Sequence, residues 1–318
     1  MKNIVKINIL IGFLFIVSLY EVNAQITSDS SVVNKEYDNL GEALENPKDV
    51  YRLNLSDQNF NSFSDSIWDK FENLEYLSLK NDHLKEIPSG IGSLKNLKIL
   101  DLSNNDFKVL PQSFSRLENL REIYLNDEKE MDINQSLRTI QDLPNLKKLH
   151  LENDNLNALS NNIWGEFENL EYLSLKNDHL REIPSGIGNL KNLKILDLSN
   201  NDFKVLPQSF SRLENLREIY LNDEKEMDID KSLRAIKDLT NLKILHLEND
   251  NLKNIPQNLL QLTNLESLYL NNNSFKEFPI ELKKLKNLNY IDFNNNQFKL
   301  NGQNFQSPFM GPGIIINF

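Results

Sequence analysis

Apolar residues recur along most of the chain with a fixed spacing. From Leu97 to Phe107 the sequence follows the pattern L-x-x-L-x-L-x-x-N-x-F, continues as L-P-x-x-F-x-x-L up to Leu117, and then begins again. Leu97, Leu100 and Leu102 alternate as the residues of a short strand do. The pattern therefore predicts a coil with one short strand and a return segment, repeated many times.

Eleven repeats can be counted from Val50 to Phe298, at intervals of 23 to 26 residues. Each coil has about seven inward apolar side chains, worth roughly 1.5 to 3 kcal/mol each. This burial cannot offset roughly 1 to 2 kcal/mol of backbone entropy for each of about two dozen residues. A single coil is therefore predicted to be unfolded, and stability to come from stacked neighbours. The strands are predicted to open at Val50, Leu74, Leu97, Leu120, Leu146, Leu170, Leu193, Leu216, Leu242, Leu265 and Leu288.

This register resembles the leucine-rich repeat family. The outer segments at 87–94, 110–117, 183–190 and 255–262 resemble the L-P-x-x-I-x-x-L step of its 23-residue subclass, L-x-x-L-x-L-x-x-N-x-L-x-x-L-P-x-x-I-x-x-L. The resemblance implies an α/β fold: a curved solenoid with a parallel sheet on the concave face and short helices, 3-10 turns or loops on the convex face. Secreted bacterial members include adhesins and effectors, so the resemblance implies binding without naming a ligand.

Four coils of the chain are duplicated as a block. Residues 68–156 recur as residues 164–252, with 79 of the 89 aligned positions identical. Recent duplication explains this identity, because it preserves every position whether or not the position is useful. Identity between the copies is therefore no evidence of function.

The segments before the repeats predict export and a cap. Residues 1–24 resemble a secretory signal, with Lys2 and Lys6 before an apolar run and a small residue, Ala24, at its end. The alternative is a membrane anchor, although the run is short for a bilayer span. Residues 25–36 are predicted to be a flexible leader, and 37–49 a capping helix over the first coil.

The segment after the repeats, residues 299–318, has no helical cap pattern. Unless this tail folds back, the last coil leaves an open strand edge and an open core. We expect residues 314–318 to pack on the last coil or pair with it. The alternative is a homodimer through that open end.

Composition excludes several functions. The 318 residues contain no Cys, so no disulfide framework, thiol nucleophile or cysteine metal cluster is expected, and no cofactor is predicted. Removing Lys2, Lys6 and Glu21 with the signal leaves 33 basic against 45 acidic residues. A surface with this balance repels phosphate backbones, so nucleic acid is not an expected partner.

Positions between the inward leucines of each strand are predicted to face a partner. They carry many tyrosine and histidine side chains, which offer large contact area with polar tips. The alternative is that these rings pair across strands and only stabilise the sheet. The histidines also predict that protonation changes affinity. The candidate partner-binding residues are Tyr76, Asp101, Tyr124, His150, Tyr172, Asp197, Tyr220, His246, Tyr269 and Tyr290.

The asparagine position of the repeat holds Asp in four coils, among them Asp154 and Asp178 on neighbouring strands. One interpretation is calcium binding between these two carboxylates, with help from Glu152. The other is an aspartate that accepts backbone N–H groups in a turn.

Two longer coils carry acidic insertions, at residues 125–133 and 221–229. Asp127, Glu128 and Glu130, like their copies Asp223, Glu224 and Glu226, are expected to project from one rim. They are interpreted as recognition loops or as solvated insertions.

His150, Ser174 and Asp197 supply the residue types of a hydrolase triad on adjacent strands. Their order is wrong, because the base must lie between nucleophile and acid. Two strand spacings also separate His150 from Asp197 by about 9.6 Å. We therefore predict no enzyme activity.

Together these observations predict a secreted, periplasmic or cell-surface module that binds a partner protein on its concave face. The alternatives are a structural or envelope protein that associates through its ends, and a glycan-binding adhesin. No membrane span is expected after signal cleavage.

Overall fold

The computed structural model describes residues 35–156, 159–224, 226–298 and 314–318. The expected signal and most of the leader lie outside the described residues, as does the tail up to residue 313.

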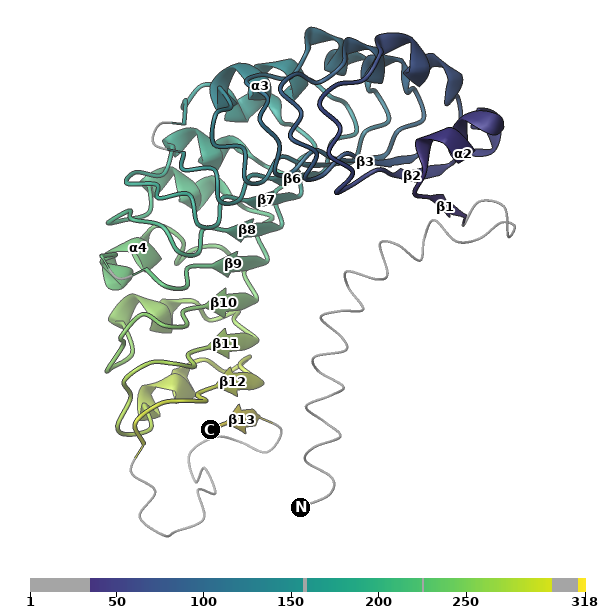
Figure 1. The fold of residues 1–318 in the computed structure, drawn as a ribbon. Coiled ribbons are helices and arrows are strands. Elements are labelled where there is room, and N and C mark those ends of the chain that lie inside the picture. The colour runs from purple at the N-terminus through teal and green to yellow at the C-terminus, as the bar shows by residue number, and fades with distance from the viewer. Residues whose placement is uncertain (1–34, 157–158, 225, 299–313) are drawn as a thin grey trace, which may run out of the picture.

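The described chain forms one open sheet of 13 strands in sequence order, and every neighbouring pair is parallel. The sheet lines the inner side of an arc (Figure 1). This is the curved α/β solenoid that the repeat predicts. The first strand is β1 (Glu36–Tyr37) and the last is β13 (Ile315–Asn317). Between them, one strand comes from each counted repeat: β2 (Arg52–Asn54), β3 (Tyr76–Ser78), β4 (Ile99–Asp101), β5 (Glu122–Tyr124), β6 (Lys148–His150), β7 (Tyr172–Ser174), β8 (Ile195–Asp197), β9 (Glu218–Tyr220), β10 (Ile244–His246), β11 (Ser267–Tyr269) and β12 (Tyr290–Asp292).

Short helices form the outer side of the coils. In the L-P segments the proline precedes the first helical residue, where its fixed φ suits the chain entering the turn. The insertion-bearing coils instead carry α3 (Ile133–Ile140) and α4 (Ile229–Arg234). The remaining outer segments are 3-10 helices: η2 (Asp65–Lys70), η3 (Ser89–Ser93), η4 (Gln112–Arg116), η5 (Trp164–Glu166), η6 (Ser185–Asn189), η7 (Gln208–Arg212), η8 (Gln257–Gln261) and η9 (Ile280–Lys284).

The N-terminal cap differs from the single helix expected over 37–49. It consists of β1, the six-residue α2 (Leu40–Glu45) and η1 (Pro47–Asp49). Asn39 caps α2 by accepting the N–H of Glu42, and Ala43 is buried against the first coil. Strand β1 pairs with β2, so the cap also extends the sheet by one strand.

The inward leucines form one continuous core. Leu97, Leu100 and Leu102 are fully buried, as the strand pattern predicts. Trp68 and its copy Trp164 fill the outer side of their coils and are also fully buried. Each coil therefore shares its core with the coils above and below it.

The C-terminal segment covers the last coil. Strand β13 pairs with β12, so the expectation that residues 314–318 pack on or pair with this coil is confirmed. The ring of Phe318 stacks on that of Phe293, with centroids 6.1 Å apart and planes at 16°.

Side chains at the asparagine position of the repeats connect neighbouring coils beyond the strand ends. We call this row of side chains the ladder. In Asn105 the Oδ1 atom accepts the N–H of Leu84 (2.9 Å), while Nδ2 donates to the carbonyls of Leu79 (2.8 Å) and Leu102 (2.7 Å). Just before the ladder, every coil turns through a left-handed residue with φ between 57° and 66°, at Asp57, Asn81, Asn104, Asp127, Asn153, Asn177, Asn200, Asp223, Asn249, Asn272 and Asn295. Asn and Asp tolerate this conformation better than other residues with a side chain.

The expectation that Glu128 and Glu224 project from the rim is wrong. Glu128 is 2% exposed, and its Oε1 accepts the N–H of Asn105 (2.8 Å). Glu224 does the same for Asn201 (3.0 Å). Glu128 lies eight residues after Leu120, as Asn105 lies eight residues after Leu97, so Glu128 and its copy Glu224 occupy the asparagine position of their repeats. Glu130 remains exposed.

The aspartates of the ladder accept backbone N–H groups, which is the second of the two interpretations above. Asp178 accepts the N–H of Asp154 (2.8 Å), and Asp154 accepts that of Glu128 (2.5 Å). The other oxygen of each carboxyl group is buried and has no hydrogen-bond partner among the described residues. Burial raises the pKa of Asp154 and Asp178 to about 8, and that of Glu128 to about 9. No group of three or more His, Asp or Glu residues in the described chain is arranged to bind a metal ion.

Candidate binding surface

All ten candidate residues lie on strands β3 to β12 of the concave sheet. Nine are partly exposed, whereas His246 is buried with 4% of its surface exposed. His246 therefore positions the neighbouring rings and exposes little surface that a partner could contact. Two groups of these residues surround the two copies of one histidine. We call them the N-terminal ring cluster (Tyr124, His150 and Tyr172) and the C-terminal ring cluster (Tyr220, His246 and Tyr269).

The N-terminal ring cluster is built on β5, β6 and β7. The hydroxyl of Tyr124 donates to Oε1 of Glu122 (2.6 Å), and the Nε2 of His150 lies 3.1 Å from the same oxygen. The rings of Tyr124 and His150 stack with centroids 4.0 Å apart, and Tyr172 follows at 4.7 Å. Glu152 lies 3.8 Å from the Nδ1 of His150.

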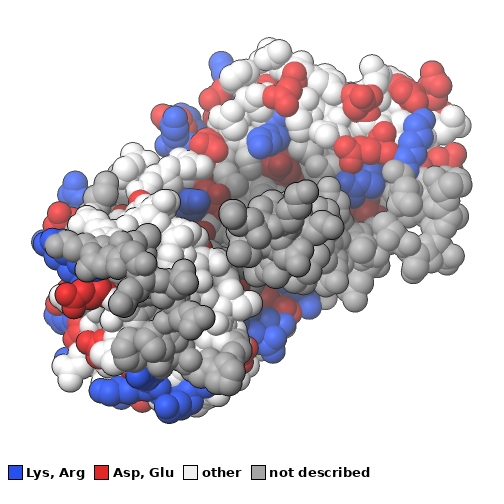
Figure 2. Space-filling model, turned by 90° about the horizontal axis from the view of Figure 1, so that it is seen from below, with Lys and Arg blue, Asp and Glu red and all other residues white. Residues whose placement is uncertain are grey.

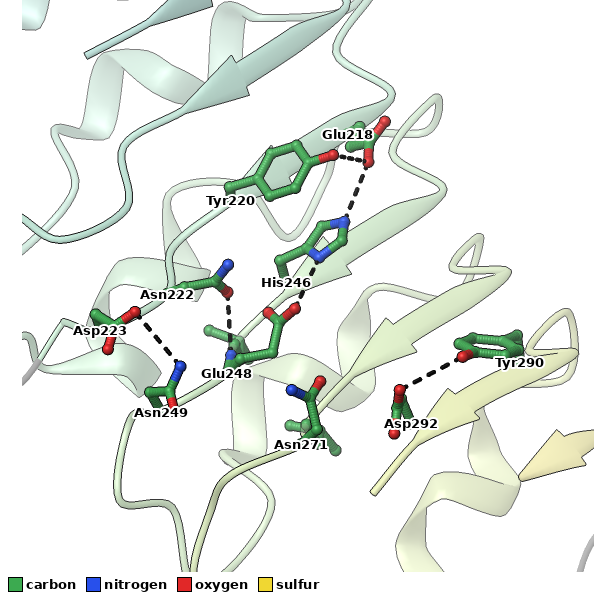
Figure 3. Close-up of polar contacts among 12 residues, drawn as sticks. Glu218, Tyr220, Asn222, Asp223, His246, Glu248, Asn249, Asn271, Tyr290 and Asp292 are labelled. Atoms are coloured by element: carbon green, nitrogen blue, oxygen red, sulfur yellow. Dashed lines mark hydrogen bonds and ion pairs between the residues drawn. The ribbon is translucent and has the colours of Figure 1, made fainter. Parts of the chain in front are cut away.

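The C-terminal ring cluster lies on β9, β10 and β11. Figure 3 shows the Tyr220 hydroxyl and His246 both directed at Glu218, at 2.6 and 3.1 Å. The ring of His246 lies between Tyr220 (3.9 Å, 14°) and Tyr269 (4.2 Å, 7°). Glu248 contacts the other ring nitrogen, Nδ1, at 3.2 Å. The two clusters thus share the arrangement of glutamate, tyrosine and histidine, whereas the third ring differs, because Tyr269 is in register with its histidine and Tyr172 is not.

Carboxylates at both ring nitrogens favour the protonated form of His246. A neutral imidazole has only one N–H, whereas the protonated ring can donate to both carboxylates. Burial by itself lowers the pKa of an imidazole, but the hydrogen bonds to Glu218 and Glu248 outweigh it, so the pKa of His246 lies above its usual value. In His150, hydrogen bonds to Glu122 and Glu152 outweigh burial in the same way and raise the pKa.

The two clusters also differ in a neighbour of the glutamate. In the N-terminal cluster Lys148 lies 3.4 Å from Glu122, and the pKa of that carboxyl falls to about 2 because the His150 and Lys148 contacts outweigh burial. In the C-terminal cluster the equivalent residue is Ile244. The row of rings there continues to Tyr290, which lies 5.2 Å from Tyr269.

The four glutamates that orient the rings were not among the predicted site residues. Glu122 and Glu218 stand two residues before a tyrosine, and Glu152 and Glu248 two residues after a histidine. In a strand, this spacing puts both side chains on one face. The spacing was visible in the sequence, but their partners on neighbouring strands were not.

The structure brings His150, Ser174 and Asp197 onto neighbouring strands without forming a triad. His150 and Ser174 are in register, and Asp197 pairs with Ser174 on the next strand. Both nitrogens of His150 face Glu122 and Glu152 instead. The imidazole is thus occupied by carboxylates and is not directed at a serine nucleophile.

A polar hollow of about 720 Å³ lies at the edge where the coils turn, away from the ten candidate residues. Its lining contains no apolar residue. It includes Asp127 and Glu130 from the first insertion together with Lys129, Asn153, Asn155, Asn177 and His179. In the coil that follows the second block the equivalent of His179 is Ser274, so the hollow is not a duplicated feature.

Figure 2 shows acidic and basic side chains interspersed on the described face seen from below. Of the helices that the structure describes, none is long and apolar enough to cross a bilayer.

Family comparison agrees with the fold. The leucine-rich repeat region family matches residues 50–163 and 145–230, and the leucine rich repeat family matches residues 264–285. The chain belongs to the leucine-rich repeat family. No curated protein matches the sequence.

Solved structures with the same fold include a leucine-rich repeat protein of Leptospira interrogans. It is 22% identical with a TM-score of 0.50, and the match covers 90% of this chain and all of that one. The ectodomain of the Arabidopsis thaliana receptor kinase GASSHO1/SCHENGEN3, solved with CASPARIAN STRIP INTEGRITY FACTOR 2, is 29% identical (TM-score 0.53) over 77% of this chain. TLR13 in its complex with ssRNA13 is 20% identical (TM-score 0.56) over 85%. The chain spans only 29% of the plant receptor and 47% of TLR13.

Proposed function

We propose that this protein is an exported protein-binding module that recognises a partner protein with its concave face. The observation that carries the proposal is the pair of ring clusters, in which partly exposed tyrosines are held in fixed orientations by buried carboxylates and histidines. Rigid aromatic side chains with hydroxyl tips are the usual anchors of protein interfaces. The ten candidate residues named above form the proposed surface.

Export is proposed from residues 1–24, and the 23-residue bacterial secreted type from the repeated L-P segments. In this proposal residues 25–36 are a leader, 37–49 cap the solenoid, 50–298 form the repeat domain and 299–318 the tail. N-terminal sequencing of the exported protein should begin at Gln25. An exported protein that retains Met1 would contradict cleavage at this point.

The plant receptor ectodomain supports a binding role, because it was solved with a bound factor and is 29% identical to this chain. The present chain covers less than a third of that receptor, so the likeness suggests the type of activity and no particular ligand. A glycan ligand on the same face is the alternative that fits the aromatic surface.

The test is the double variant Tyr220→Ala with Tyr269→Ala in a crosslinking pull-down from the native cell envelope, read by mass spectrometry. We expect capture of the partner protein to be lost and the melting temperature to stay within about 3 °C of the parent, because both rings are partly exposed. Tyr51→Ala, which removes a ring outside both clusters, should retain capture. If melting drops while capture persists, the rings only stabilise the sheet.

Association through the C-terminal end is a second candidate. Strand β13 is the last strand of the sheet, and Ile315 on it is 47% exposed. Size-exclusion chromatography with light scattering, with and without residues 308–318, separates the two candidates. A concentration-dependent dimer that the deletion abolishes would favour end association.

A further inference from the structure

Equivalent places on two halves of the concave face carry the same number of acidic residues, but only one half carries lysines. Counted from the strand-opening leucines, the acidic residues on β5 to β8 and the turns after them are Glu122, Glu152 and Asp197, and those on β9 to β12 are Glu218, Glu248 and Asp292. The two lysines of the first half, Lys148 and Lys176, are replaced in the second half by Ile244 and Asn271. The second half therefore lacks two positive charges that the first half supplies itself.

Lys176 shows what one of these charges does. It follows β7, and its neighbours are Glu152 after β6 and Asp197 on β8. The contact with His150 lowers the pKa of Glu152 most, and the charge of Lys176 lowers it further. Burial raises the pKa of Asp197, and the charge of Lys176 opposes that shift. One ammonium group thus interacts with carboxylates on both neighbouring coils.

Asn271 takes the place of Lys176 on the second half. Figure 3 shows Asn271 between Glu248 and Asp292, with no dashed line to either residue. Burial raises the pKa of Asp292 against hydrogen bonds from Asn294, and the charge of Glu248 raises it further. Within the described chain Asp292 forms no salt bridge. The two carboxylates therefore interact with each other across a position that has no cation.

One oxygen of Asp292 remains able to accept a strong hydrogen bond. Its Oδ1 atom accepts the backbone N–H (2.9 Å) and the side-chain Nδ2 (2.7 Å) of Asn294. Its Oδ2 atom has a contact of 3.5 Å with the hydroxyl of Tyr290, which also accepts a hydrogen bond from Asn317 (2.8 Å). A hydrogen bond of 3.5 Å is weak. Since Asp292 is also partly exposed, a partner can reach this carboxylate.

Tyr269 provides an apolar wall beside this carboxylate. It is in register with Asp292 on the neighbouring strand and is partly exposed. His246 covers one face of its ring (4.2 Å, 7°), which fixes the orientation of the ring. The equivalent residue on the first half is Ser174, counted from Leu170 and Leu265. The combination of a free carboxylate and an adjacent ring therefore occurs only on the second half.

We propose that a lysine side chain of the partner protein binds over Asn271, between Glu248 and Asp292 and against the ring of Tyr269. We call this place the lysine site. The inference rests on the proposed protein-binding function and names the chemistry that the concave face selects. The polar groups come from three coils, which suits the diverging N–H donors of an ammonium better than a flat guanidinium. The ring of Tyr269 can contact the apolar stem of the lysine.

The first test measures butylammonium, which is the lysine side chain without its backbone, against the full chain by NMR at constant ionic strength. We expect a saturable shift of the carboxyl carbon of Asp292, and no saturable shift of that of Asp197, which already has Lys176 beside it. Neutral butanol should leave Asp292 unchanged. Butylguanidinium should bind at least about threefold more weakly. Tighter binding of butylguanidinium would overturn the assignment to lysine.

Two pairs of variants separate the lysine site from general attraction to an acidic protein. Asp292→Asn should weaken butylammonium binding at least about fivefold, because a charge-assisted hydrogen bond is lost. Glu281→Gln removes the same charge at an exposed position of the same coil and should change affinity less than about twofold. Asn271→Lys should abolish butylammonium binding and lower the pKa of Asp292, because the new ammonium occupies the site. Asn289→Lys adds the same charge at an exposed position and should change affinity less than about twofold.

Equal effects within either pair, or no saturable shift of Asp292, would overturn the lysine site. In the pull-down from the cell envelope, Asn271→Lys should lose the native partner and Asn289→Lys should retain it. If the Tyr220→Ala, Tyr269→Ala protein loses the partner while Asn271→Lys retains it, the protein-binding function stands and the lysine site is wrong.

Discussion

The Nε2 of His246 lies 3.1 Å from Oε1 of Glu218, the same oxygen that accepts the hydroxyl hydrogen of Tyr220. One carboxylate therefore positions two rings that stack on each other. Because Glu248 lies on the other side of the imidazole, two carboxylates favour the protonated form of His246. This arrangement makes the stability of the concave face depend on pH.

The imidazole of His246 is expected to titrate above the value of about 6.5 for an unfolded histidine. Its pKa is raised in the folded state, so its contribution to stability is complete below pH 6.5 and is lost as pH rises through the folded value. Urea unfolding of the parent and of His246→Asn should differ most near pH 6 and least near pH 9. An NMR titration that gives His246 a pKa below 6.5 would refute this.

The double variant Asp154→Asn with Asp178→Asn is expected to stabilise the protein at pH 8. In the parent, burial raises both carboxyl pKa values to about 8 from about 4 in the unfolded chain. Their contribution is complete below pH 4 and declines as pH rises to about 8. The Nδ2 group of an asparagine donates a hydrogen bond at every pH, as that of Asn105 does. Each hydrogen bond that the substitutions restore adds about 1 kcal/mol to the free energy of unfolding.

Urea unfolding at pH 5 and pH 8 measures this effect, which should be larger at the higher pH. Asp69→Asn, which changes an exposed aspartate outside the ladder, is the control and should leave stability unchanged. Lower stability of the double variant at pH 8 would mean that the ladder depends on ionised carboxylates.

Gly186 is expected to tolerate no larger residue, because a Cβ there would lie 1.9 Å from the carbonyl oxygen of Asn161 in the preceding coil. Gly186→Ala should lower the free energy of unfolding by about 1 to 3 kcal/mol through overpacking. Gly165→Ala is the matched control, since its nearest non-neighbouring atom would be 3.9 Å away, on Asn189. It should change stability by less than about 0.5 kcal/mol. Equal stability of both variants would show that the coils can separate at this contact.

The residues of the concave face could be predicted from the sequence because strand alternation assigns every second side chain to one face. Tyr124, His150 and Tyr220 were found in this way. Their pairing with Glu122 and Glu218 could not be predicted, since it depends on which rotamers bring neighbouring strands into contact. The burial of His246 was unexpected for the same reason: two flat rings on adjacent strands cover it.

The placement of Glu128 could have been read from the sequence. Glu128 lies eight residues after Leu120, as Asn105 lies eight residues after Leu97, so residue counting puts it at the asparagine position of the repeat. It was assigned to the rim because acidic residues next to an insertion usually face solvent. The structure directs it inward, where its carboxylate accepts the N–H of Asn105.

By itself the sequence determined the coil, the number of strands in the repeat array and the side of each strand that faces the core. These features follow from local periodicity and from the burial that neighbouring coils must share. Only the tertiary structure decided which side chains on that face meet: the stacked rings, the histidines held between carboxylates, and the buried carboxyl ladder. Those relationships join residues about 23 to 28 positions apart, whose contact depends on how the coils stack and which rotamers they leave room for.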